Sequence, residues 1–160
     1  MRNYIYELLQ VPTPANEWTS SWDYQKHPDA FPIADTVDEA KDRDQAILQL
    51  GSWLHSNRLG SLTGEAFTMD TEAANRYFQG RFTAFQQAIA ALQSLNEIQF
   101  IHEHNRVQNL INDLCQTFCG TYGDYVLLGD DLTPVPMEEF LRKAQAGICY
   151  YIGAVLDYKH

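Results

Sequence analysis

The chain has 160 residues, of which 45% are hydrophobic, so it can close one core without disulfide or metal cross-links. Its 21 acidic and 11 basic residues give a net charge of −10, which repels phosphate backbones and anionic lipid head groups and disfavours direct binding to nucleic acid or membranes. Three cysteines fit no disulfide framework, and no signal peptide or membrane-length apolar run is present, so we expect a cytoplasmic protein.

The N-terminal third of the chain contains one short regular segment and one long connection. Residues 3–10 partly alternate apolar and polar side chains, which predicts a strand. Four prolines interrupt residues 12–35, which predicts a loop. Because this loop carries several aromatic residues, we expect it to pack onto the body of the protein.

Four helices are predicted from apolar residues that recur at intervals of three and four. The first begins at a capping-box pattern, Thr36 to Glu39, and the second follows Asp70 as its cap. The third covers about 96–118, and the last runs from Pro134 or Pro136 nearly to the C-terminus.

The remaining β structure is predicted at residues 122–129, which mix aromatic and aliphatic side chains between glycines and suit pairing with the N-terminal strand. The predicted fold is therefore a mainly α (α+β) protein, a four-helix core with a minor short β element, in a single domain spanning 1–160. The second and fourth helices are apolar over more than half their circumference. Either they are central to the bundle, or the excess surface meets a second subunit in a homodimer.

Acidic residues are concentrated after the aromatic loop. They can bind a basic protein surface, with the loop aromatics as anchors, although acid near a helix start is also what the helix dipole prefers. The predicted partner-binding residues are Asp35, Asp38, Glu39, Asp42, Asp44, Trp18, Trp22 and Tyr24.

Metal-ligating residues occur in two places. His102 and His104 lie two apart, which on a helix directs their imidazoles to opposite sides, and this favours one histidine that packs and one that is solvated over a shared ion. Cys115 and Cys119 lie four apart on one helix face, but a second ligand pair is missing, so core packing is the favoured interpretation. We expect no cofactor and keep these four residues as weak metal candidates.

Two functions of different classes remain. The preferred hypothesis is a non-catalytic acidic protein that engages a basic protein surface, in its sharpest form an inhibitor that occupies a nucleic-acid-binding groove and mimics phosphate charge. The alternative is a small helical enzyme or metal-binding protein with a His, Cys and carboxylate site between helices. A structural oligomer is a third interpretation. Phosphate loops, nucleophile elbows and paired zinc-binding cysteines are absent from the sequence, which favours a non-enzyme.

Overall fold

The computed structural model describes residues 3–32, 34–70, 72–119, 122–129, 131–144 and 147–159. The chain forms two compact units. Met1–Ala74 and Tyr122–His160 make one, which we call the sheet unit, and Asn75–Thr121 make the other, the helical hairpin.

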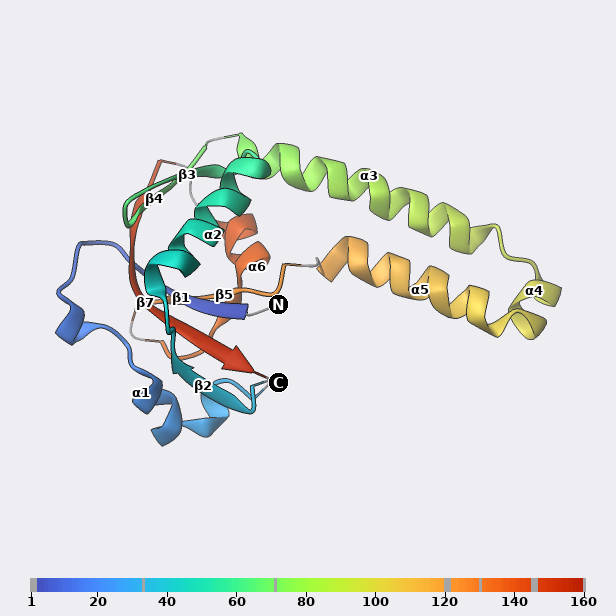
Figure 1. The fold of residues 1–160 in the computed structure, drawn as a ribbon. Helices are drawn as coiled ribbons and strands as arrows, with labels where there is room; N and C mark the ends of the chain where they lie inside the picture. The colour runs from blue at the N-terminus through green and yellow to red at the C-terminus, as the bar shows by residue number, and fades with distance from the viewer. Residues whose placement is uncertain are drawn as a thin grey trace. The chain divides into compact units, whose positions relative to one another are not determined.

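The sheet unit is built on seven strands, most of them antiparallel to their neighbours. Their order is β3-β4-β7-β1-β5-β6, and β2 also pairs with β7 (Figure 1). The only parallel ladder among the described strands joins β1 and β5. The strands are β1 (Asn3–Leu9), β2 (Thr36–Glu39), β3 (Gly60–Thr63), β4 (Ala66–Met69), β5 (Tyr125–Leu128), β6 (Val135–Pro136) and β7 (Cys149–Lys159).

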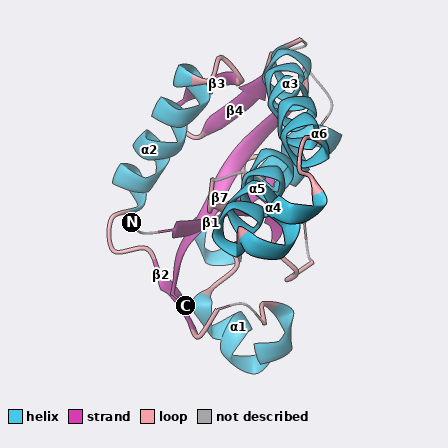
Figure 2. Ribbon diagram, turned by 90° about the vertical axis from the view of Figure 1, so that its right-hand side faces the viewer, coloured by secondary structure: helices cyan, strands magenta, loops and turns pink. Residues whose placement is uncertain are grey.

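Strand β7 organises this sheet because it is long enough to pair with three others. Along one edge it pairs with β1, and along the other its first residues pair with β4 and its last residues with β2. In Figure 2, β4 and β7 lie side by side. Every residue from Ile152 to Tyr158 except Gly153 has a buried apolar or acidic side chain, so β7 is covered on both faces.

Different elements cover the two faces of the sheet. Adjacent residues of a strand point to opposite faces, and Ile5 lies in a buried cluster with Tyr24 and Phe31. Tyr6 faces the other way, and its hydroxyl donates to the carbonyl of Ala46 (2.9 Å) in α2. The 12–35 segment therefore packs on the Ile5 face, as its aromatic content predicts, and α2 packs on the Tyr6 face.

The helices of the sheet unit are short except for α2. They are α1 (Ser21–Lys26), α2 (Arg43–Ser56) and α6 (Met137–Lys143), with single 3-10 turns at Ala15–Glu17 and Pro28–Ala30. Phe140 of α6 packs its ring against those of Phe67 in β4 and Tyr150 in β7.

The hairpin consists of α3 (Ala73–Gln93) from its third residue onward, α4 (Glu97–His102) and α5 (His104–Cys119). Asn96 caps α4 by accepting from the Gln99 amide, and the Gln99 side chain accepts in return from the Asn96 amide. Arg81 of α3 donates to the carbonyls of Thr117 (3.1 Å) and Gln116 (3.3 Å), which joins α3 to α5. Among the described residues, no helix is both long and apolar enough to cross a membrane.

The predicted four-helix core with a minor β element is wrong, because the described residues form six α-helices and a seven-strand mixed sheet. The expected last helix ends at Lys143, and Cys149–Lys159 form β7 instead. A run that is buried on both faces has no alternation of polar and apolar residues, so its period does not distinguish a strand from a buried helix.

The predicted loop at 12–35 is also partly wrong, because it contains α1 and two 3-10 turns, and the remaining errors concern where elements begin and end. The capping-box pattern at Thr36 occurs within β2, and α2 begins seven residues later at Arg43, capped by Asp42. The expected third helix is divided at Glu103 into α4 and α5. The predicted N-terminal strand and its pairing with residues 122–129 are present as the β1–β5 ladder, two strands of the larger sheet.

Candidate functional site

The net charge is concentrated in one unit. The hairpin, residues 75–121, holds three acidic and three basic residues, which leaves 18 acidic and 8 basic residues on the sheet unit. The sheet unit therefore carries the entire net charge of −10, so an electrostatic binding site is expected in this unit.

Two of the predicted acidic residues have structural roles. Glu39 accepts a hydrogen bond from the Ser21 amide (2.8 Å) at the start of α1, and Asp42 accepts one from the Gln45 amide (2.9 Å) at the start of α2. Both carboxylates therefore satisfy helix N-terminal amides, as the helix dipole favours.

The other three predicted acidic residues are exposed, and their carboxylates have no hydrogen bond or ion pair to any described residue. They are Asp35, Asp38 and Asp44. Arg43 does not neutralise them, because its guanidinium donates to the carbonyls of Gly153 and Ile152 and to Glu65. Three carboxylates thus remain available to a partner.

A groove lies beside two of these carboxylates, and we call it the acidic groove. It has a volume of about 260 Å³ and is lined by Tyr24, Gln25, Phe31, Ala34, Asp35, Thr36, Val37 and Asp38. Its lining brings together α1, β2 and residues Phe31, Ala34 and Asp35 of the connection between them. It therefore offers aromatic and aliphatic surface beside acidic side chains.

Tyr24 supplies the buried part of this groove. It is 5% exposed, and its hydroxyl has no hydrogen-bond partner among the described residues. Burial, followed by the nearby carboxylates of Asp131 and Glu7, raises the pKa of the Tyr24 phenol, so the hydroxyl stays neutral. A neutral phenol can both donate and accept a hydrogen bond.

The predicted aromatic anchors are presented differently from one another. Trp22 is 58% exposed and lies near Lys26, whose ammonium is 5.4 Å from the ring centroid. Trp18 is half-buried, and its indole nitrogen donates to the carbonyl of Thr13 (2.9 Å). Since Tyr24 is buried, Trp22 is the predicted anchor that a partner can reach most directly.

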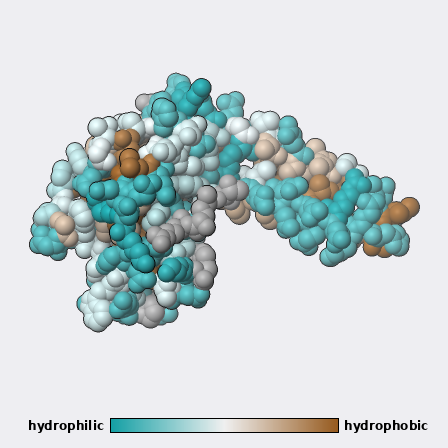
Figure 3. Space-filling view, in the orientation of Figure 1, coloured by the Kyte–Doolittle hydropathy of each residue, from teal (hydrophilic) through white to brown (hydrophobic). Residues whose placement is uncertain are grey.

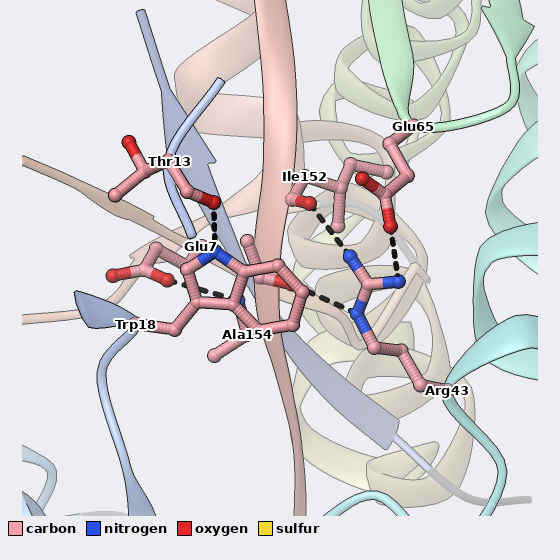
Figure 4. Close-up of polar contacts among 8 residues, drawn as sticks. Glu7, Thr13, Trp18, Arg43, Glu65, Ile152 and Ala154 are labelled. Carbon is pink, nitrogen blue, oxygen red and sulfur yellow. Dashed lines mark hydrogen bonds and ion pairs between the residues drawn. The ribbon is translucent and has the colours of Figure 1, made fainter. Parts of the chain in front are cut away.

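A second polar cluster, which sequence reasoning missed, fixes the geometry beside the groove. Figure 4 shows Arg43 between Glu65 and the carbonyl oxygens of β7, with its guanidinium 4.5 Å from the ring centroid of Trp18. Glu7 is 3% exposed and accepts from the Ala154 amide and from both the amide and hydroxyl of Thr19.

This cluster lies where the β1–β7 register shifts, between Tyr6 and Leu8. The Glu7 carboxylate binds amides of β7 and of the segment before α1, so it holds the aromatic loop against the sheet. A lone acidic residue inside the apolar run of residues 4–9 was the sequence signal for it.

A second buried acid, Asp124, holds the chain as it returns from the hairpin. Asp124 accepts from the Tyr4 amide (2.8 Å) and is hydrogen-bonded to Tyr122. Burial raises the pKa of Asp124, although these hydrogen bonds act in the opposite direction. The Tyr122 ring is stacked on Trp53 of α2, with the ring centroids 3.9 Å apart.

The weak metal candidates lie on the hairpin. His102 ends α4, His104 begins α5, and both are exposed. Cys115 and Cys119 are also exposed, so the expectation that they pack in a core is wrong. Across the described ranges, no group of three or more His, Cys, Asp or Glu side chains is arranged to hold a metal ion.

Comparison of the chain with protein-family models, with curated proteins and with solved structures finds no match.

Proposed function

We propose that this chain is a non-catalytic acidic binding protein that engages a basic protein surface through the sheet unit. The observation that carries the proposal is the set of three exposed, unpaired carboxylates, two of them on the acidic groove, in the unit that holds the whole net charge.

The groove suits a lysine or arginine side chain. The apolar stem of such a side chain packs against Phe31 and Val37, while its cationic head reaches the carboxylates of Asp35 and Asp38. Aromatic rings next to a cation add electrostatic attraction of about 0.5–1 kcal/mol at exposed sites.

Binding by this surface needs several contacts at once. A solvent-exposed ion pair contributes about 0.2–1 kcal/mol, so the groove alone gives weak binding. The exposed Trp22 of α1 widens the contact surface, and the charge of −10 accelerates encounter with a basic partner. The affinity is therefore expected to fall as salt is added.

In its sharpest form the basic surface is the groove by which another protein holds nucleic acid. The chain would then compete with the nucleic acid by presenting carboxylates in place of phosphates. An experiment in which the chain competes with duplex DNA for a purified basic DNA-binding domain tests this form of the proposal. It distinguishes occupation of a nucleic-acid-binding groove from binding to basic protein surfaces in general.

The test measures fluorescence anisotropy of a labelled oligoarginine peptide across a salt series. The variant D35N/D38N/D44N removes the unpaired carboxylates, and E97Q/E103Q/D113N makes the same change in net charge on the hairpin. We expect the first variant to bind roughly tenfold more weakly, with a flatter salt dependence, and the second to bind like the wild type.

Unchanged affinity in the first variant contradicts the proposal. Equal weakening in both variants also contradicts it, because the effect would then come from net charge alone and not from the groove.

A further inference from the structure

The helical hairpin leaves large apolar side chains in contact with solvent. Six of the ten exposed large hydrophobic residues among the described residues lie in its helices, and they include Phe82 (57% exposed) and Phe118 (63%). Figure 3 shows hydrophobic residues in brown on the hairpin surface, including its end at α4. No large side chain of residues 75–119 is buried.

The half-buried positions show which sides of α3 and α5 face each other. On α3 they include Phe78, Arg81, Phe85, Ala88 and Leu92, at alternating steps of three and four. On α5 they are Val107, Leu110, Leu114 and Thr117. The hydrogen bonds from Arg81 to α5 confirm that this seam joins the two helices.

Each helix has a second apolar stripe, whose positions each lie one residue after a seam position in the sequence. On α3 it contains Phe82 and Ile89, together with Gln79, Gln86 and Gln93. On α5 it contains Ile111, Cys115 and Phe118, together with Gln108. One residue is a rotation of 100° about a helix, and the two helices run in opposite directions, so both stripes lie on the same side of the hairpin. We call this side the amide-apolar face.

This face contains no charged residue, although 20% of the chain is charged. A helix surface that stays in water normally carries charged side chains, so an uncharged face with exposed phenylalanine and isoleucine indicates a covered surface. The opposite side of α5, one residue before the seam, carries Arg106 and Asp113, and the opposite side of α3 has mostly smaller side chains and no exposed phenylalanine or isoleucine.

We infer that a second copy of this chain covers the amide-apolar face, so that two hairpins form a four-helix bundle. The hairpin is neutral, and therefore two copies meet there without the repulsion that the sheet units exert on each other. Glutamine both donates and accepts hydrogen bonds, so the same face is complementary to itself across a twofold axis.

The size of the face fits a dimer. Helix α3 has 21 residues, which gives a length of about 30 Å, and two helices side by side are about 20 Å wide. Because α5 has 16 residues and is shorter, the resulting face of about 550 Å² approaches the roughly 800 Å² per partner of a standard interface. This inference does not depend on the proposed function of the sheet unit.

The test is the mass of the purified chain by light scattering over a dilution series. Q86E/Q108E places one negative charge per helix on the amide-apolar face and keeps every apolar side chain. Q87E/N109D places the same charges on the opposite side. Far-ultraviolet circular dichroism confirms that both variants keep their helices.

We expect the wild type and Q87E/N109D to be dimers. Q86E/Q108E should raise the dimer dissociation constant by at least about tenfold, because like charges then meet across the interface. A wild type that is monomeric at every concentration overturns the inference. So does an equal response of the two variants, since the amide-apolar face would then not be the interface.

Discussion

Glu7 provides the sharpest test of how the aromatic loop is attached to the sheet. One of its carboxylate oxygens accepts from the Thr19 amide (3.1 Å) and hydroxyl (2.7 Å), and the other accepts from the Ala154 amide (2.8 Å). Glu7→Gln keeps the shape but replaces one acceptor with an NH₂ donor. If the amide oxygen of the new glutamine keeps the hydrogen bonds from Thr19, its NH₂ group faces the backbone N–H of Ala154. That N–H is a buried donor and then has no acceptor.

The expected loss of stability follows from these contacts. An unsatisfied buried donor costs about 1–3 kcal/mol, and the remaining bonds lose their charge assistance, so the total loss is about 2–4 kcal/mol. Thr19→Val removes only the hydroxyl bond and should cost about 1 kcal/mol. Because the two side chains share one interaction, the double variant should lose less than the sum of the single variants.

The assay is urea unfolding followed by tryptophan fluorescence. All three tryptophans, Trp18, Trp22 and Trp53, lie in the sheet unit, so the signal reports on that unit. Glu17→Gln makes the same chemical change at an exposed glutamate and should stay within about 0.5 kcal/mol of the wild type. A Glu7→Gln variant as stable as the Glu17→Gln control would refute the reasoning.

Three further predictions concern the same unit. Gly153→Ala places a Cβ 2.3 Å from a carboxylate oxygen of Glu7 and should cost about 1–3 kcal/mol in urea unfolding, and a neutral effect would show that the site has room. Burial raises the pKa of Asp124, so the folded state binds its proton at a higher pH than the unfolded chain does. The wild type should therefore gain stability relative to Asp124→Asn as the pH falls from neutral toward about 4, and a difference that does not change with pH contradicts this. Trp53→Ala removes the ring stacked on Tyr122 and should cost at least about 1 kcal/mol, whereas Trp53→Phe should keep part of the stacking, which the same assay measures.

Part of the candidate site could be predicted from the sequence. The acidic segment and its aromatic neighbours are visible as composition, and three of the five acidic residues are exposed and unpaired. The sequence could not predict which of these carboxylates accept hydrogen bonds at a helix start and which stay unpaired. That depends on which helix start lies near each carboxylate in the fold. Glu39 accepts from the first amide of α1, which is 18 residues earlier in the chain, so its role depends on the tertiary fold.

By itself the sequence determined the net charge, the packing of the 12–35 loop through its aromatic residues, the helix over Ala73–Gln93, and the two strands β1 and β5. These depend on local patterns or on composition, which need no knowledge of neighbours. Only the tertiary structure decided that Cys149–Lys159 is a strand, because a segment covered on both faces has the same apolar composition in a sheet as in a helix. It also decided which groups Glu7 and Arg43 bind, since the Ala154 amide and the Gly153 carbonyl that they contact belong to a strand more than 100 residues away.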